Sequence, residues 1–125
     1  MLVGSRMTYP VITISPRATL DSANDLINKE SIHSLPVVDR QGRLLGLITK
    51  DKLDSALCKN GSTNEAESEL LVEDYMMTQV LTVTENTPIE EAARIISDYD
   101  IKSLPVIRGN YVVGIIIFSI LVIIQ

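Results

Sequence analysis

The sequence SIHSLPVV (residues 31–38) returns 69 positions later as DIKSLPVI (residues 100–107). An isoleucine, a serine, a leucine, a proline and a valine occupy the same places in both copies of this phrase. A repeat with such a period indicates that the chain contains two copies of one supersecondary unit. The repeat therefore determines the fold class before any single residue is interpreted.

The similarity continues upstream of the repeated phrase. The stretch MTYPVITISP resembles MTQVLTVTEN, with Met7-Thr8 aligned to Met77-Thr78 and one extra residue in the first copy. Beyond this extra residue, the offset of 69 positions holds up to the repeated phrase. Two copies of the unit thus account for most of the 125 residues.

Each copy begins with a predicted strand and a predicted helix. Short runs rich in β-branched residues at 11–14 and 81–83 are typical of strands. In the second copy, residues 87–90 (Thr-Pro-Ile-Glu) combine a capping hydroxyl, a proline at the first helical position and a glutamate placed for a capping box. Apolar residues then recur at helical spacing in both copies, which predicts one apolar stripe facing a core.

After each helix, two apolar runs flank a short polar turn, a pattern that predicts a β-hairpin. The second runs, LLGLI (44–48) and VVGII (112–116), match after a one-residue deletion in the turn. Their nearly continuous hydrophobicity indicates strands that are covered on both faces. Apolar residues within 53–57 predict a short helix after the first hairpin. The expected unit is β-α-β-β-α, and the expected fold class is α+β.

Residues 59–69, KNGSTNEAESE, separate the two copies. This segment is polar and contains Asn-Gly, so we expect an exposed linker. The first repeat then occupies residues 1–58 and the second occupies residues 70–125. Since neither repeat has enough residues for a robust core of its own, we expect the two to pack together about a pseudo-two-fold axis.

The composition limits the classes of partner. The chain is 46% hydrophobic, which is sufficient for a real core, and it has 16 acidic against 11 basic residues. This mildly acidic balance disfavours nucleic acid as a partner. Eight of the basic residues lie within residues 1–59, so any anion site is expected in the first half.

Cysteine use and the amino-terminal sequence suit a cytoplasmic protein. The single cysteine, Cys58, cannot form an internal disulfide, and packing as a small apolar residue is favoured over a redox role. The opening MLVGSRMTYP lacks the pattern of a signal peptide.

The sequence shows no nucleophile–base pair, metal-ligand set or Gly-rich phosphate loop. We therefore expect no enzyme activity, no metal and no required cofactor.

The ordered motifs of the two copies resemble the halves of a tandem CBS-domain pair, the Bateman module. The resemblance covers roughly residues 5–57 and 72–121 and includes both copies of the phrase that ends in LPVV or LPVI. The opening MLV…RMT is also similar to CBS pairs of acetoin-utilisation-type proteins. The resemblance implies that the phrase leads into a strand beside a cleft between the repeats, where an adenosine-containing ligand binds.

By the same resemblance, ligand-binding positions fall on the first strands, on the repeated phrase and at the end of the first hairpin. They are Val11, Thr13, His33, Ser34, Pro36, Thr49, Asp51, Lys52, Val80, Thr82, Lys102, Ser103 and Pro105. Other roles remain open for them. The valines and threonines also suit strand packing, the prolines suit the start of a strand because proline fixes φ, and the histidine and lysines are also ordinary surface residues.

The first copy departs from the family pattern at one position. Nucleotide-binding CBS copies carry Gly-hydrophobic-X-Thr/Ser-X-X-Asp/Asn, in which the hydroxyl and the carboxylate hold the ribose. Gly46 and Thr49 match this pattern, but Lys52 stands at the acidic position and Asp51 comes one residue early. Lysine cannot accept hydrogen bonds from ribose hydroxyls, although it can pair with a phosphate.

The second copy departs further, because Ile117 and Ile120 replace the hydroxyl and the acid. At most one competent nucleotide site is therefore expected, in the first copy.

Residues 111–124 form an apolar run that is shorter than the roughly 20 residues of a membrane span. An apolar terminal helix from Phe118 to Ile124 needs cover from water, which predicts either a homodimer through the terminal helices or a further C-terminal domain packed against them.

These features predict a regulatory, small-molecule-sensing module for signal transduction. An adenosine-containing ligand of the AMP, ADP, ATP or S-adenosylmethionine type would bind in the cleft between the repeats and act through dimer or partner contacts. The alternative is a CBS scaffold that binds no nucleotide and acts in oligomerisation or protein interaction. The loss of the ribose-binding acid in both copies favours this alternative.

Overall fold

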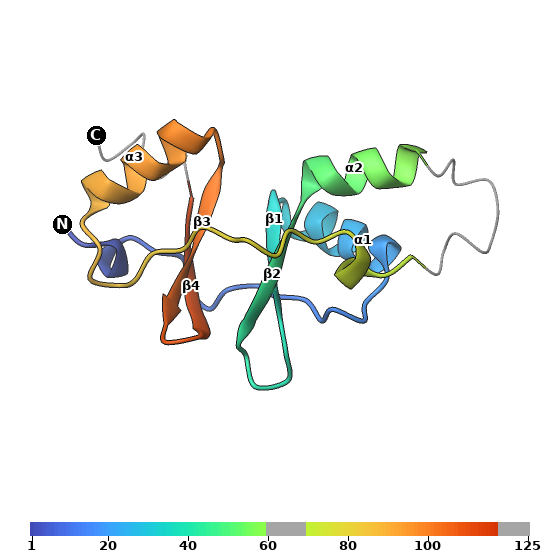
Figure 1. Ribbon diagram of the computed structural model, residues 1–125, viewed down its shortest axis with the longest axis horizontal. Helices are drawn as coiled ribbons and strands as arrows, with labels where there is room; N and C mark the ends of the chain where they lie inside the picture. Colours follow the sequence, from blue (N-terminus) through green and yellow to red (C-terminus); the bar gives the residue numbers. More distant parts are fainter. Residues whose placement is uncertain (60–69, 118–125) are drawn as a thin grey trace. The chain divides into compact units, whose positions relative to one another are not determined.

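The structure is a computed structural model that describes residues 1–59 and 70–117 (Figure 1). Its small antiparallel sheets and helices confirm the predicted α+β class. Both the body of the predicted linker and the predicted terminal helix, Phe118 to Ile124, lie outside the described residues. In chain order the elements are η1 (Val3–Ser5), α1 (Leu20–Glu30), β1 (Ser34–Val38), β2 (Leu44–Thr49), α2 (Lys50–Lys59), η3 (Val72–Asp74), α3 (Ile89–Tyr99), β3 (Ser103–Arg108) and β4 (Tyr111–Ile117).

The chain divides into two compact units, which are described separately. The central unit is Ile12–Val80, and the terminal unit combines Met1–Val11 with Leu81–Gln125. Each unit therefore contains most of one sequence repeat together with the amino-terminal segment of the other repeat.

In the central unit, β1 and β2 form an antiparallel hairpin, and α1 and α2 supply apolar residues to the same core (Figure 1). The helical spacing of apolar residues in α1 is the reason that one side of this helix is buried. The predicted helix at 53–57 is present as the longer α2. The buried core residues are Leu20, Ala23, Ile27, Leu35, Val37, Ile48, Leu53, Ala56 and Val72.

The terminal unit repeats this arrangement with the antiparallel hairpin β3–β4 and helix α3. Both hairpins have a register irregularity at the same place, between Val37 and Val38 and between Val106 and Ile107. The buried core residues of this unit are Val3, Val83, Ile89, Ala92, Ile96, Leu104, Val106 and Ile116.

Residues 1–11 are an integral part of the terminal unit. Val3 is fully buried in its core, and its N–H donates to the carbonyl of Thr87 at 2.8 Å. Thr8 and Ile115 exchange two backbone hydrogen bonds, at 2.7 Å and 3.1 Å, so the segment pairs with the outer edge of β4.

Residues 70–80 play the same part in the central unit. Val72 is fully buried, and its N–H donates to the carbonyl of Ala18 at 2.8 Å. Met77 and Leu47 exchange backbone hydrogen bonds of 2.8 Å and 2.9 Å, which pair the segment with β2. Removal of either segment would therefore expose the core of the unit that contains it.

These pairings correct the predicted alignment of Met7-Thr8 with Met77-Thr78. Thr8 and Met77 occupy equivalent bridge positions, so Met7 corresponds to Met76 and the offset of 69 holds through both segments. The Met-Thr dipeptide identity was misleading because an identical pair of residues does not fix a backbone register.

The glycines of LLGLI and VVGII make room for these methionines. A Cβ added at Gly46 would lie 2.7 Å from Met76 Sδ, and a Cβ added at Gly114 would lie 2.6 Å from Met7 Sδ. Glycine is thus required in β2 and β4 by the close approach of a neighbouring segment.

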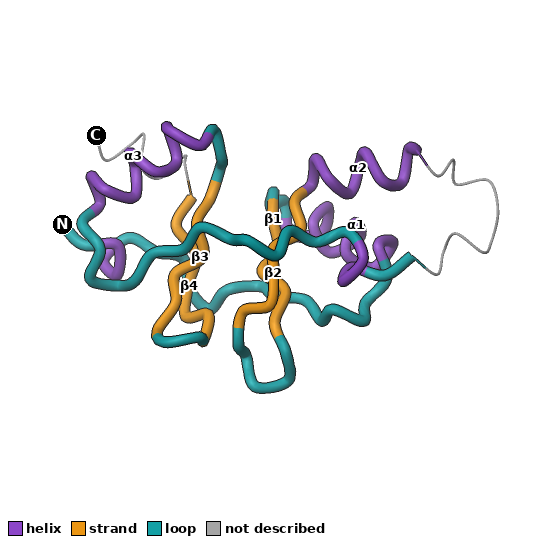
Figure 2. Tube along the Cα trace, viewed as in Figure 1, coloured by secondary structure: helices purple, strands orange, loops and turns teal. Residues whose placement is uncertain are grey.

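The strands predicted at 11–14 and 81–83 are reduced to single bridges, and each bridge lies in a loop that leads into α1 or α3 (Figure 2). In the central unit, Ile14 N–H donates to the carbonyl of Pro36 at 3.0 Å, and Val38 N–H donates to the carbonyl of Ile14 at 3.0 Å. The preceding bond of a parallel ladder would need an N–H at residue 36, which proline lacks. Proline occupies the equivalent place beside the bridge at Val83.

The two helix starts differ, and the predicted capping box at 87–90 is wrong. Thr19 caps α1, because its side chain accepts a hydrogen bond from Ser22 N–H at 3.1 Å. The corresponding cap of α3 is Pro88, which makes no side-chain cap bond. Thr87 Oγ1 instead accepts from the N–H of Thr84 at 3.0 Å and stabilises the preceding turn.

Helices α1 and α3 end in the same way, immediately before the residues of the repeated phrase. Ser31 and Asp100 adopt left-handed conformations with φ of 56° and 53°. The next N–H groups, of Ile32 and Ile101, donate to carbonyls in the last helical turn, which is the bonding of a Schellman motif. This motif reverses the chain and directs it into β1 or β3.

Candidate functional site

The repeated phrase places a buried serine at the start of each hairpin. Ser34 pairs with Thr49 across β1 and β2, whereas Ser103 pairs with Ile117 across β3 and β4. Both serines are more than nine-tenths buried. The two hairpins thus match at the serine but differ at the residue opposite it in the ladder. This residue carries a hydroxyl only in the central unit.

Thr49 is the residue at which β2 ends and α2 begins. Its Oγ1 accepts a hydrogen bond from the N–H of Lys52 at 3.2 Å, so it acts as the amino-terminal cap of α2. A threonine hydroxyl that accepts one hydrogen bond still has a proton to donate. Thr49 can therefore cap the helix and bind a ligand oxygen at the same time.

His33 lies beside this helix start. Its carbonyl accepts a hydrogen bond from Lys50 N–H at 2.8 Å, which fixes the backbone of the repeated phrase to the first turn of α2. The His33 side chain is exposed. The central unit thus brings together His33, Ser34 and Thr49 at one end of the β1–β2 hairpin.

The predicted residues Asp51 and Lys52 lie in the first turn of α2, and both are exposed. Counted from the cap at Thr49, Asp51 is the second helical residue and Lys52 is the third. Successive helical residues are rotated by about 100°, so the two side chains leave the helix in different directions. The carboxylate of Asp51 therefore does not replace an acid at position 52.

Lys50 is a polar contributor that the sequence analysis did not single out. Its Nζ lies 3.5 Å from Asn28 Oδ1 in α1, which links the two helices next to the His33 carbonyl. Its place directly after Thr49 was the only available signal, because contact with Asn28 depends on how the helices pack.

The terminal unit has a different character at the corresponding end. Lys102 is exposed and Ser103 is buried, but Ile117 supplies no hydroxyl to cap a helix or to contact a ligand. Ile120, at the position of the family's acidic residue, lies outside the described residues. The described part of this unit has lost one of the two ribose-binding groups that the family pattern requires.

The remaining predicted residues flank the single bridges. Thr13 and Val80 belong to the central unit and are half-buried, and Val11 and Thr82 belong to the terminal unit and are also half-buried. Pro36 and Pro105 are buried in β1 and β3. The prolines interrupt the ladders beside these segments, so the prolines have a defined structural role in addition to any binding role.

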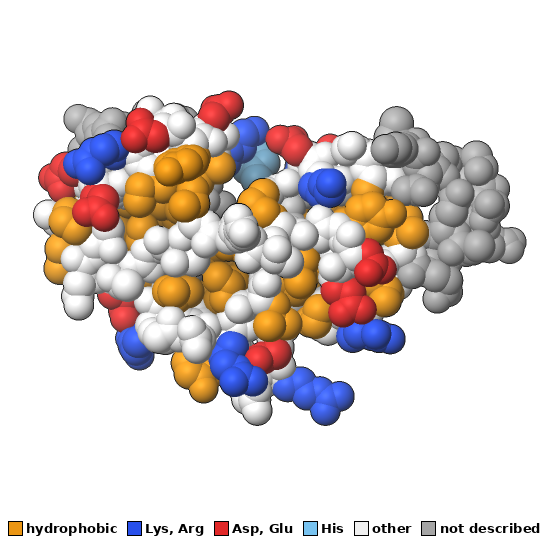
Figure 3. Space-filling view, viewed as in Figure 1, with side chains coloured by type: hydrophobic (Ala, Val, Ile, Leu, Met, Phe, Trp, Pro, Cys, Tyr) orange, Lys and Arg blue, Asp and Glu red, His pale blue; other side chains and the backbone are white. Residues whose placement is uncertain are grey.

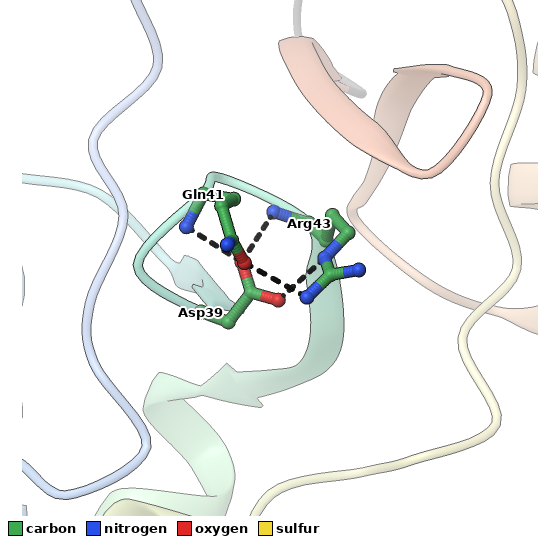
Figure 4. Close-up of polar contacts among 3 residues, drawn as sticks. All are labelled: Asp39, Gln41 and Arg43. Carbon is green, nitrogen blue, oxygen red and sulfur yellow. Dashed lines mark hydrogen bonds and ion pairs between the residues drawn. The ribbon is translucent and has the colours of Figure 1, made fainter.

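The turn at the other end of the β1–β2 hairpin is organised by Asp39 (Figure 4). Backbone hydrogen bonds from Arg43 and Gln41, together with the Arg43 guanidinium, hold the pKa of Asp39 below its usual value despite partial desolvation. Arg43 also donates to Gln41 Oε1 at 2.8 Å. These contacts are internal to the turn, which indicates a structural role.

Other classes of site find little support in the described residues. Residues 1–59 and 70–117 contain no group of three or more His, Cys, Asp or Glu side chains placed to hold a metal ion. Within the same ranges, no helix has the length and apolar character needed to cross a bilayer. Acidic and basic side chains are interspersed over the face shown in Figure 3.

Comparison with known families and structures supports the resemblance seen in the sequence. The family described as CBS domain matches twice, at residues 3–59 and 72–121. The CBS domain pair of protein MJ0100, solved in complex with 5′-methylthioadenosine and S-adenosyl-L-methionine, is 29% identical, with a TM-score of 0.88 over 99% of this chain and 94% of that chain. A putative acetoin utilization protein (AcuB) from Vibrio cholerae is also 29% identical, with a TM-score of 0.87 over 99% of this chain and 89% of that chain.

A curated relative places the same module in a longer protein. The L-aspartate semialdehyde sulfurtransferase of Methanocaldococcus jannaschii is 32% identical over 116 residues. The match covers 92% of this chain but only 21% of the relative. The similarity is therefore confined to about a fifth of that protein.

Proposed function

This chain belongs to the CBS domain family and carries the domain twice, and we propose that it is a regulatory module that senses an adenosine-containing small molecule. The observation that carries the proposal is the likeness, over nearly the whole chain, to a CBS domain pair solved with 5′-methylthioadenosine and S-adenosyl-L-methionine. AMP, ADP and ATP share the adenosine group of these ligands and belong to the same class of candidates.

The first CBS domain is the proposed binding domain. Thr49 would donate its hydroxyl proton to a ribose oxygen while it caps α2. His33 and Ser34 would face the phosphate or sulfonium end of the ligand, and Thr13 would lie along the base. The backbone next to Ile14 is suited to bind the adenine base. Because Pro36 has no N–H, the hydrogen-bonded ladder does not continue past the single bridge at Ile14.

The second CBS domain is proposed to bind adenosine ligands weakly or not at all. Ile117 stands where Thr49 stands in the first domain and offers no hydrogen bond. Val80, Thr82, Lys102, Ser103 and Pro105, which belong to this domain, and Val11, which belongs to the terminal unit, then serve mainly the structure of the module.

Ligand binding would act on a partner, since the module has no proposed chemistry of its own. A ligand shifts an equilibrium only through different affinities for two states, so binding at the first domain would favour one arrangement of the module. We propose a cytoplasmic homodimer through the terminal segment Phe118–Ile124, whose apolar residues need cover. Size-exclusion chromatography tests this part, and a monomer at micromolar concentration would contradict it.

The second candidate function is a scaffold that binds no nucleotide. Lys52 at the position of the ribose-binding acid is the observation that favours it, because an ammonium cannot accept hydrogen bonds from a ribose. The two functions differ in one measurable property, which is stabilisation by adenosine ligands.

Thermal melting with AMP, ATP and S-adenosylmethionine tests the proposal. A ligand at about 100 times its Kd stabilises the native state by about 2.7 kcal/mol and raises the Tm. Thr49→Ala should abolish the ligand-induced shift. Thr19→Ala is the matched control, because it also removes a helix cap but should keep the shift. No shift with any of the three ligands at millimolar concentration would favour the scaffold.

A further inference from the structure

The first turn of α2 carries an unusual distribution of charge. A helix amino terminus favours acidic side chains because of the helix dipole. The first turn of α1 has Asp21, and that of α3 has Glu90 and Glu91. In α2, by contrast, Lys50 and Lys52 flank a single acidic residue in the first turn.

The two lysines differ in their surroundings. Lys50 Nζ contacts Asn28 Oδ1 in α1. Lys52 is exposed, and within the described part of the chain its ammonium group makes no hydrogen bond or ion pair. A positive charge in the first turn of a helix is unfavourable because of the helix dipole. Within the described part of the chain, no side chain pairs with the Lys52 ammonium to compensate for this.

Lys52 is also close to the proposed ribose position. Its N–H donates to Thr49 Oγ1 at 3.2 Å, so the two residues are the third helical residue and the cap. In a capping box, the side chain at this third position reaches back to the cap residue. A group that binds the hydroxyl of Thr49 is therefore within reach of the Lys52 ammonium.

We propose that Lys52 selects adenosine ligands that carry a phosphate on the 2′ or 3′ oxygen of the ribose. The inference rests on the proposed function, since it takes the ribose to lie beside Thr49. A carboxylate accepts hydrogen bonds from two free ribose hydroxyls, whereas an ammonium pairs with a phosphate. Dinucleotide sites follow the same rule, with an acid for a free 2′-hydroxyl and a basic residue for a 2′-phosphate.

Isothermal titration calorimetry with 5′-AMP, adenosine 2′,5′-bisphosphate and adenosine 3′,5′-bisphosphate tests this selection. At least one bisphosphate should bind the wild-type chain roughly ten- to a hundredfold more tightly than AMP, as expected for a hydrogen-bonded charged pair. The advantage should shrink as the salt concentration rises. Lys52→Asp should remove this advantage and strengthen the binding of AMP.

Arg40→Asp provides the matched control. It makes the same change from a positive to a negative side chain in the exposed turn at the opposite end of β2, so it should leave the preference for the bisphosphate unchanged. Equal affinity for AMP and both bisphosphates, or a preference that persists in Lys52→Asp, would overturn the inference and leave the proposed function intact. If none of the three nucleotides nor S-adenosylmethionine binds, both fail together.

Discussion

Replacing Gly46 with alanine would test the contact between β2 and residues 70–80. The new Cβ would lie 2.6 Å from the carbonyl oxygen of Met77 and 2.7 Å from Met76 Sδ. The Met77 oxygen cannot move alone, because Met77 and Leu47 exchange two backbone hydrogen bonds. Overpacking costs about 1–3 kcal/mol, and weakening two hydrogen bonds adds about 1 kcal/mol. We expect a loss of roughly 2–4 kcal/mol, or about 8–15 °C in Tm for a chain of this size.

Gly114→Ala is the matched variant in the terminal unit. Its Cβ would meet Met7 Sδ at 2.6 Å, but the nearest backbone atom, the oxygen of Thr8, is 3.1 Å away. The end of a methionine side chain can move, so the expected loss is smaller, about 1 kcal/mol.

Urea unfolding of both variants measures the difference. Met7→Ala should cost less in the Gly114→Ala background than in the wild type, because it removes the colliding sulfur atom. Met76→Ala should give little recovery in Gly46→Ala, since the Met77 carbonyl remains. Wild-type stability of Gly46→Ala, or a greater loss in Gly114→Ala, would refute the close approach of residues 70–80 to β2.

Two further predictions concern the central unit. Thr19→Ala should lower the free energy of unfolding by about 1 kcal/mol, because it leaves Ser22 N–H at the start of α1 without its cap; an unchanged urea midpoint would contradict this. Asp39→Asn should destabilise the chain at neutral pH, because hydrogen bonds from Arg43 and Gln41 lower the pKa of the folded carboxyl. The wild-type advantage should be full above about pH 4 and disappear as the pH falls through the lowered pKa; an advantage that grows with acidity would contradict it.

The sequence was sufficient for the architecture because the decisive patterns are local. The apolar spacing of α1 and α3 and the apolar runs on either side of a polar turn predicted the helices and the two hairpins. The internal repeat then predicted that the two hairpins would match, as they do down to the irregularity before Val38 and Ile107. The tandem CBS assignment followed from the order of these motifs and is confirmed by the family match.

Features that depend on distant contacts could not be predicted in the same way. The composition of 11–14 favoured a strand, but Pro36 limits the ladder there to one bridge at Ile14. The pairing of residues 1–11 with β4, and of residues 70–80 with β2, has no local signal. The structure shows that the glycines of LLGLI and VVGII accommodate these segments, a role that the sequence analysis did not assign to them.

The candidate site was predicted in its residues but not in their arrangement. The family pattern identified Thr49 and Lys52, whereas the structure adds that Thr49 caps α2 by accepting from Lys52 N–H. The hydrogen bond from Lys50 to the His33 carbonyl depends on how the hairpin meets α2 and was not visible in the sequence. The binding role of these residues stays a prediction.

A crystal structure of the chain grown with an adenine nucleotide tests the central claim most directly. We expect ligand density in the first CBS domain, with a ribose oxygen about 2.7–3.0 Å from Thr49 Oγ1. We expect no such density beside Ile117. Nucleotide density beside Ile117 in place of Thr49, or a ligand-free first domain at saturating nucleotide, would contradict the account.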